Sequence, residues 1–179
     1  MFDAPEMPDT FWCTNRAANF CAYPSQAEDG RVWVITAFDP AGGSRRELLR
    51  IPTEPGVTYD WGLSPDGSQI AIFKSDWNTG EIRFFPVAGG EARTVTVKGY
   101  VNLNSICWAQ DSKSLFVGTS GSIGATLLHV ELDGNARPIW QQPYAGERDG
   151  TWGIPSPDGR HLTVLGQSAE ANVWMIDNF

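Results

Sequence analysis

The residue types that most often carry chemistry are sparse in this chain, which has two histidines and three cysteines. His129 in "LLHVEL" and His161 in "GRHLTVL" both fall inside segments that we expect to be strands. A catalytic base or metal ligand needs partners that converge on it in space, and no such set stands out. We therefore expect each histidine to pack between structural units or to form a hydrogen bond there, and we predict no catalytic residue, no cofactor and no metal.

Motifs that would point to enzymatic chemistry are also missing from the sequence. The stretch "GTSGSIG" at 118–124 has the wrong spacing for a G-x-S-x-G nucleophile elbow. Neither a glycine-rich phosphate loop nor a C-x-x-C metal motif occurs. The glycine turns that contain aspartate match neither the calcium-ligand spacing of an EF-hand nor a sialidase Asp-box. The sequence thus favours a protein that is not an enzyme.

The first two cysteines, Cys13 and Cys21, flank a short polar turn in "FWCTNRAANFCAYP". If this segment is a hairpin, the two residues lie opposite each other at a spacing that permits a disulfide. The alternative is a pair of reduced, packed thiols. A disulfide would favour an oxidising, extracytoplasmic location. Cys107, in "SICWAQ", is expected to be a small buried hydrophobic residue.

A recurring aspartate is the most informative feature of the chain. Asp66, Asp111 and Asp158 lie 45 and 47 residues apart, in "SPDG", "AQDSK" and "SPDG". In such a turn proline fixes φ, the aspartate caps the backbone, and Gly67 or Gly159 takes a positive φ without steric cost. We therefore interpret the aspartates as structural turn residues of an internal repeat.

Around each aspartate the same order of elements recurs: a strand, the turn, an apolar strand, a loop, a third strand and a glycine turn. No apolar spacing of three and four residues persists long enough to predict a helix. Four-stranded units with a period near 45 residues are typical of β-propeller blades. We predict an all-β chain of about four antiparallel blades after an N-terminal extension at 1–9. The expected blades are residues 10–52, 58–98, 102–141 and 150–179.

The overall composition agrees with many short strands, with 19 glycines, 12 prolines and 8 tryptophans. A net charge of −8 argues against binding nucleic acid through this region. No segment approaches the roughly 20 apolar residues that would span a membrane as a helix.

The segments "SPDGSQIAIF" and "SPDGRHLTVL" resemble the repeat of TolB-like, WD40-like (PD40) β-propellers. More narrowly, "LNSICWAQDSKSLFVG", "LLHVELDGNARPIW" and "NVWMIDNF" look like the C-terminal sensor propeller region of acidobacterial proteins. In those proteins the region follows a serine/threonine kinase domain or a winged-helix domain. The resemblance implies a non-enzymatic recognition or sensor module that binds a protein or small molecule on behalf of another domain.

Four blades are few for a closed ring. If the ring stays open, the stack of blades leaves a sheet face uncovered. The sequence leaves three solutions open: a tight four-bladed ring, part of a longer propeller, or a homodimer that completes one larger ring. We expect one of the latter two.

The loops that do not repeat are the expected binding surface, at the end of the blades opposite the aspartate turns. Exposed aromatic, arginine and asparagine side chains are typical of recognition surfaces. The candidate ligand or partner residues are Trp77, Lys98, Tyr100, Asn102, Asn104, Tyr144, Arg148, Asp149 and Trp152. For Tyr100 and Trp152 the alternative is that they fill the central channel. The alternative function is the substrate-gating propeller of a peptidase or other hydrolase.

Overall fold

A computed structural model describes residues 10–15, 18–122, 124–143 and 150–167. In these residues the regular structure is entirely β, apart from a single 3-10 turn at Glu28–Gly30, so the predicted fold class is confirmed. The described residues also contain no helix long and apolar enough to cross a membrane.

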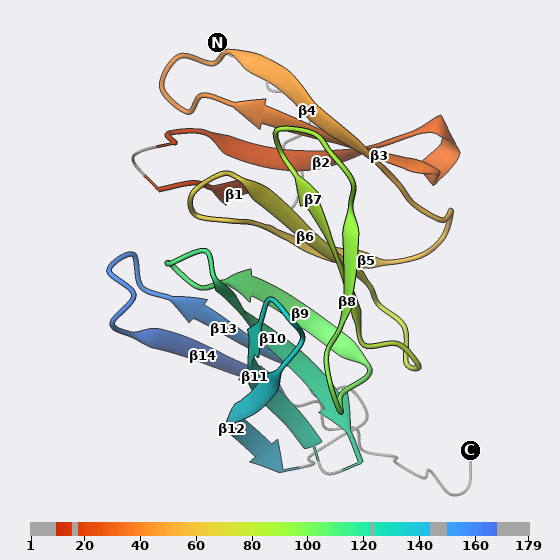
Figure 1. Ribbon diagram of the computed structural model, residues 1–179, viewed down its shortest axis with the longest axis vertical. Coiled ribbons are helices and arrows are strands. Elements are labelled where there is room, and N and C mark those ends of the chain that lie inside the picture. The colour runs from red at the N-terminus through yellow and green to blue at the C-terminus, as the bar shows by residue number, and fades with distance from the viewer. Residues whose placement is uncertain (1–9, 16–17, 123, 144–149, 168–179) are drawn as a thin grey trace, which may run out of the picture.

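The strands form consecutive antiparallel sheets, each built from neighbours in the chain (Figure 1). The first sheet consists of β1 (Trp12–Cys13), β2 (Cys21–Ala27), β3 (Val32–Phe38) and β4 (Arg45–Pro52). The second consists of β5 (Tyr59–Leu63), β6 (Gln69–Lys74), β7 (Glu81–Pro86) and β8 (Arg93–Thr96). The third consists of β9 (Leu103–Trp108), β10 (Ser114–Gly121), β11 (Gly124–Glu131) and β12 (Ala136–Pro143). The fourth consists of β13 (Gly150–Pro155) and β14 (Leu162–Gln167). Its expected third strand, "NVWMID" at 172–177, lies outside the described residues.

The sheets pack face to face in chain order, with the first at the top of Figure 1, the second below it, and the third and fourth side by side in the lower half. The innermost strands meet in sequence, because β5 contacts β1 and β9, and β9 contacts β13. This arrangement of four-stranded antiparallel sheets with the first strand of each innermost is that of propeller blades.

Two apolar clusters hold the first three sheets together. Ile35 and Ile51 of the first sheet pack with Trp61 and Ile70 of the second, all almost fully buried. The opposite face of the second sheet packs on the third through a larger cluster. Its buried members are Ala71, Phe73, Ile82, Phe84, Val97, Leu103, Ile106, Trp108, Leu115, Val117, Leu128 and Val130. Burying side chains on both faces of the middle sheets is the main source of stability here.

The aspartate turns have the geometry that their sequences predict. Asp66 Oδ1 accepts hydrogen bonds from the Ser64 hydroxyl at 2.6 Å and the Ser68 N–H at 3.0 Å. Asp158 accepts from the Ser156 hydroxyl and from the Arg160 N–H in the same way. These bonds replace backbone partners that a tight turn cannot supply.

The degenerate turn "AQDSK" keeps the same backbone conformation without its glycine. Ser112 has φ +58° where Gly67 and Gly159 have +72° and +67°. Asp111 Oδ1 accepts the Lys113 N–H at 2.9 Å, as in the other two turns. This turn therefore keeps its backbone shape although serine stands where the other two turns have glycine.

The fourth sheet lies close against the third. A side chain at Gly153 would meet Leu127, and one at Gly118 would meet the oxygens of Thr151 and Asn104. The absence of a Cβ at both positions lets the two backbones approach.

Of the two histidines, only His129 lies inside a strand. It belongs to β11 and packs edge-on against Phe116, with ring centroids 5.7 Å apart. His161 precedes β14 and is exposed, so the prediction that it packs between units is wrong. We expected the strand to include His161, but β14 begins at Leu162, so His161 belongs to the preceding polar turn.

Candidate functional site

Side-chain hydrogen bonds to backbone oxygens tie the innermost strands together across each successive sheet boundary. The indole Nε1 of Trp12 donates to the Trp61 oxygen at 3.0 Å. Trp108 Nε1 donates to the Gly62 oxygen at 3.0 Å. Between the third and fourth sheets, the Ser105 hydroxyl donates to the Thr151 oxygen at 2.6 Å. These bonds fix the inner strands, and hence the loops that connect them.

Asp60, near the start of β5, is a partly buried acid that links the second and third sheets. Its Oδ2 accepts the Ile106 N–H at 3.1 Å, and its Oδ1 accepts the Trp61 N–H at 2.8 Å. Burial raises the pKa of Asp60 to about 6, and the two backbone donors oppose this shift. The carboxylate acts as an acceptor between sheets, and no other acid or base among the described residues is bonded to it in a catalytic arrangement.

Antiparallel pairing divides the connections between two ends of the sheets. The turns after the first and third strand of each sheet lie at one end, which we call the turn end. The connections after the second and fourth strands lie at the other, which we call the loop end. Trp77, in the β6–β7 loop, is at the loop end and is 73% exposed. An indole this exposed is available for contact with a partner.

The β8–β9 connection lies directly beside the loop that carries Trp77. Its Asn102 N–H donates to the Thr79 oxygen at 3.1 Å, and Gly80 leaves room for the Tyr100 oxygen. The Tyr100 ring packs against the apolar cluster between the second and third sheets. Tyr100 thus anchors the β8–β9 connection, and Trp77 projects from the neighbouring β6–β7 loop.

Asn102 and Asn104 meet at Ser120. Asn102 Nδ2 donates to the Ser120 oxygen at 2.9 Å, and Asn104 Nδ2 donates to its hydroxyl at 2.6 Å. Two nearby buried acceptors, Asn104 Oδ1 and Thr151 Oγ1, have no hydrogen-bond partner among the described residues. Unsatisfied buried acceptors are costly, so a donor from a ligand or water would stabilise this region.

The other candidate residues do not gather at the same point. Lys98 Nζ donates to Asn135 Oδ1 at 2.8 Å, in the β11–β12 turn of the third sheet. Trp152 is half-buried on β13, opposite Leu165 of β14. Tyr144, Arg148 and Asp149 lie outside the described residues. The structure therefore places Trp77, Tyr100 and Asn102 on two neighbouring connections, with Asn104 at the start of β9.

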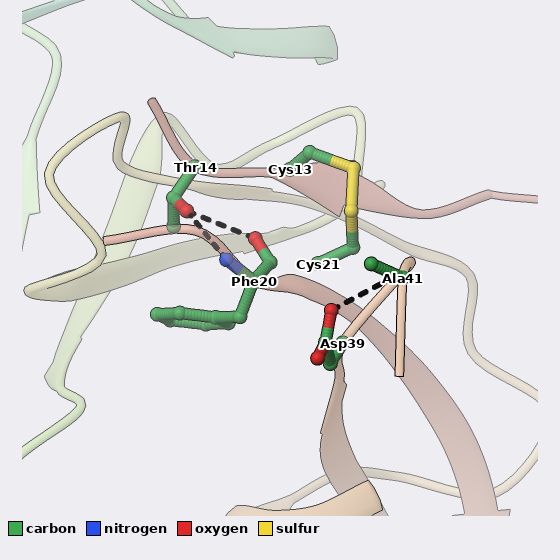
Figure 2. Close-up of a disulfide and its surroundings, with 6 residues drawn as sticks. All are labelled: Cys13, Thr14, Phe20, Cys21, Asp39 and Ala41. Atoms are coloured by element: carbon green, nitrogen blue, oxygen red, sulfur yellow. Dashed lines mark hydrogen bonds between the residues drawn. A yellow bond between two sulfur atoms is a disulfide. The ribbon is translucent and has the colours of Figure 1, made fainter. Parts of the chain in front are cut away.

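A disulfide joins Cys13 of β1 to Cys21 of β2, whose Cα atoms are 3.9 Å apart in direct register (Figure 2). The turn that it closes is also held by Thr14, whose Oγ1 accepts the Phe20 N–H at 3.0 Å. The disulfide favours an oxidising compartment.

A hollow of about 340 Å³ lies beside this turn, at the turn end of the first sheet. Arg45, Arg46 and Asp39 supply its charges, and the guanidinium of Arg46 lies 5.8 Å from the centre of the Phe20 ring. Asp39 Oδ1 is occupied within its own loop by the Ala41 N–H at 2.8 Å (Figure 2). The remaining lining residues are Ala18, Asn19, Ala37, Phe38 and Ser44.

Burial shifts the pKa of two groups that could carry chemistry, Cys107 and His129. Burial and the nearby charge of Asp60 raise the pKa of the Cys107 thiol to about 12, so it is unreactive at neutral pH. Burial lowers the pKa of His129. Within the described ranges, no three His, Cys, Asp or Glu side chains form a group that could hold a metal ion.

Solved structures with a similar arrangement of sheets include TolB proteins. TolB from Acinetobacter baumannii is 16% identical, with a TM-score of 0.62 over 92% of this chain and 39% of that chain. A putative TolB from Agrobacterium tumefaciens is 19% identical, with a TM-score of 0.62 over 88% of this chain and 54% of that chain. The chain has a TolB-like propeller fold. At these identities the likeness shows the fold alone, and the chain spans about two fifths and about half of the two TolB chains.

A prolyl endopeptidase also shares the fold, at 16% identity and a TM-score of 0.56, over 86% of this chain and 25% of that chain. No protein-family model matches the sequence, and no curated protein matches it. The TolB-like fold therefore rests on the arrangement of strands.

The sequence interpretation missed three residues near the loop end: Asp60, Ser105 and Thr151. Each is a polar side chain inside an otherwise apolar inner strand. That interruption is the signal that would have identified them, since a buried polar group requires a partner.

Proposed function

We propose that this chain is a non-enzymatic recognition module that binds a protein or peptide at the loop end of its blades. The exposed indole of Trp77 carries the proposal, because it projects beside a connection anchored by Tyr100 and the Asn102–Ser120 bond. Exposed aromatic residues on rigid supports are typical anchors of protein interfaces.

The resemblance to sensor propellers suggests a finer version of this function. In it, the chain senses its ligand outside the cytoplasm and serves an attached kinase or winged-helix domain, with no cofactor. The Cys13–Cys21 disulfide supports the oxidising location. The same proposal includes completion of a larger ring, either by a second copy or by further blades of a longer protein.

The proposal is tested by selecting peptides from a displayed random library on the immobilised chain. Trp77→Ala and Arg148→Ala should each weaken the selected peptides at least tenfold while the melting temperature stays unchanged. The matched control is Lys113→Ala, an exposed residue at the turn end whose backbone N–H, and not its side chain, bonds Asp111. If Lys113→Ala abolished binding of the selected peptides and Trp77→Ala did not, the choice of the loop end would be wrong. Failure to select any peptide would count against peptide recognition.

A substrate-gating propeller of a peptidase is the second candidate, because a prolyl endopeptidase shares the fold. The two functions differ in what the same polypeptide carries. An α/β-hydrolase domain encoded in frame with this region would favour gating, and a kinase or winged-helix domain would favour sensing.

A further inference from the structure

The outward face of the fourth sheet exposes a set of apolar side chains. Cross-strand pairing places Trp152 opposite Leu165 and Ile154 opposite Thr163, so all four share one face. Ile154 is 52% exposed and Leu165 is 58% exposed. The other face of this sheet, with Thr151 and Gly153, is the one packed on the third sheet.

The first sheet has a matching uncovered face at the other end of the stack. Ile35 and Ala37 point from β3 into the core, so Val34, Thr36 and Phe38 point away from it. Phe38 forms an aromatic group with Tyr23 and with Phe11, which is 48% exposed. Aromatic and aliphatic side chains thus form part of a face on which no other described sheet packs.

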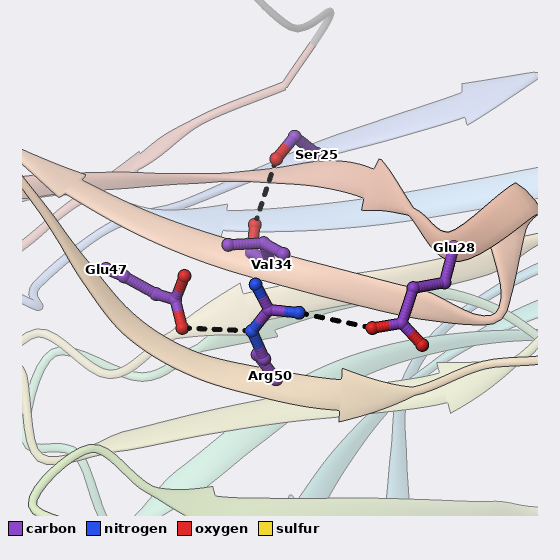
Figure 3. Close-up of polar contacts among 5 residues, drawn as sticks. All are labelled: Ser25, Glu28, Val34, Glu47 and Arg50. Atoms are coloured by element: carbon purple, nitrogen blue, oxygen red, sulfur yellow. Dashed lines mark hydrogen bonds and ion pairs between the residues drawn. The ribbon is translucent and has the colours of Figure 1, made fainter.

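Arg50, on this outward face of the first sheet, is paired with two glutamates. Arg50 Nε donates to Glu47 at 3.2 Å and its Nη1 to Glu28 at 3.3 Å (Figure 3). Figure 3 also shows Ser25 and Val34 on this face, where the serine hydroxyl donates to the valine oxygen. A docked second sheet would meet Arg50 with its charge already countered by Glu47 and Glu28, and would also face Arg45, which lies opposite Phe38.

The chain itself shows how such faces pair. At each of its three sheet boundaries, the face that points toward the chain's end packs on the face of the next sheet that points toward its start. The uncovered face of the fourth sheet corresponds to the faces that pack on a following sheet. The uncovered face of the first sheet corresponds to the faces that pack on a preceding sheet. The two ends of one chain are therefore complementary by the rule that its own interfaces follow.

We propose that the Trp152–Ile154–Leu165 face of the fourth sheet is covered by the Tyr23–Val34–Phe38 face of the first sheet of a second copy. Two such contacts, related by a twofold axis, would close a ring from two chains. This deepens the ring completion included in the proposed function, and it is independent of the ligand that the loops bind.

The first test is the mass of the full chain in solution by light scattering. The expected result is a dimer of the 19.6 kDa chain, and a monodisperse monomer or an assembly that grows with concentration would overturn the proposal. Leu165→Glu should convert the dimer to monomer with a dissociation constant raised at least a hundredfold. The matched control is Val101→Glu, which also adds a charge to a half-exposed aliphatic residue but lies on neither face.

A mixing experiment tests which faces meet. Leu165→Glu blocks the fourth sheet, and Ser25→Arg blocks the first sheet at an exposed residue, so each variant alone should be monomeric. Their mixture should form a heterodimer, because one copy retains an intact first sheet and the other an intact fourth sheet. If Ser25→Arg alone remained a dimer, the fourth sheet would pair with itself and the proposed pairing would be wrong. Unchanged melting temperatures exclude unfolding, and peptide binding at Trp77 in the monomeric variants separates this proposal from the recognition function.

Discussion

The backbone N–H of Asp66 donates to the hydroxyl of Ser112 at 3.1 Å, so the turn of one sheet is bonded to the turn of the next. Ser112 is also the residue that replaces glycine in the degenerate third-sheet turn, at φ +58°. One side chain therefore gives both a conformational cost and a contact between sheets. A glycine at this position would remove the cost and lose the contact.

Because the cost of the positive φ opposes the gain from the hydrogen bond, variants at Ser112 can separate the two effects. Ser112→Ala keeps the positive φ and loses the hydrogen bond, so it should lower the free energy of unfolding by about 1 kcal/mol. Ser112→Gly also loses the bond but relieves the backbone, and should be about 1 kcal/mol more stable than the alanine variant. Urea unfolding of the three proteins measures both differences. Equal stability of the alanine and glycine variants would show that the conformation at 112 carries no cost.

The disulfide is expected to stabilise the first sheet by restricting the unfolded chain. For a separation of 8 residues, its loss through Cys13→Ser with Cys21→Ser should lower the free energy of unfolding by about 2–3 kcal/mol. The denatured wild-type protein should titrate as one thiol, from Cys107, and as three after reduction. Three thiols before reduction, in protein made in an oxidising compartment, would disprove the bond.

Asp60 predicts a particular dependence of stability on pH. Its pKa in the folded protein is about 6, against an ordinary value of 3.8, so the folded state binds this proton more tightly than the unfolded state. The stability that this group contributes is present below about pH 4 and is lost as the pH rises through about 6. Asp60→Asn should therefore gain stability relative to wild type between these two values, by up to about 3 kcal/mol. Urea unfolding of both proteins across this range checks the sign, and a constant difference would contradict the prediction.

Gly118 should be intolerant of any side chain. A Cβ at this buried position would overlap the Thr151 oxygen of the fourth sheet and the side-chain oxygens of Asn104 and Ser105. Gly118→Ala is expected to cost about 3 kcal/mol by forcing the third and fourth sheets apart. Gly121→Ala on the same strand is the control, because nothing lies within 4 Å of its added Cβ. Thermal unfolding should separate the two variants clearly, and similar melting temperatures would show that the interface yields easily.

The repeat was predictable from sequence because its signal is local. The SPDG turns at 64–67 and 156–159 contain the residues that fix their own backbone, and the strands on either side alternate with them at a regular period. The positive φ of Ser112 could be inferred only by alignment with those turns. The fold class followed from these local patterns.

Contacts between sheets were not predictable in the same way. The position of Lys98 beside Asn135 depends on how β8 crosses the third sheet, and no local pattern encodes that crossing. Asp60 appeared to be an ordinary polar residue in a strand, since its partner Ile106 lies 46 residues away. The exposure of His161 was not predicted because the turn before β14 ends one residue later than the apolar pattern indicated.

The order in which the sheets pack has a mechanical consequence. Each sheet is held chiefly by its neighbours in the chain, and the end sheets have one such neighbour each. Tension applied between the two ends of the chain would load the outermost boundaries first. The sheets would then peel away singly, in steps close to the contour length of one repeat, and the Cys13–Cys21 bond would shorten only the step of the first sheet. A ring completed by further sheets would remove these weak ends.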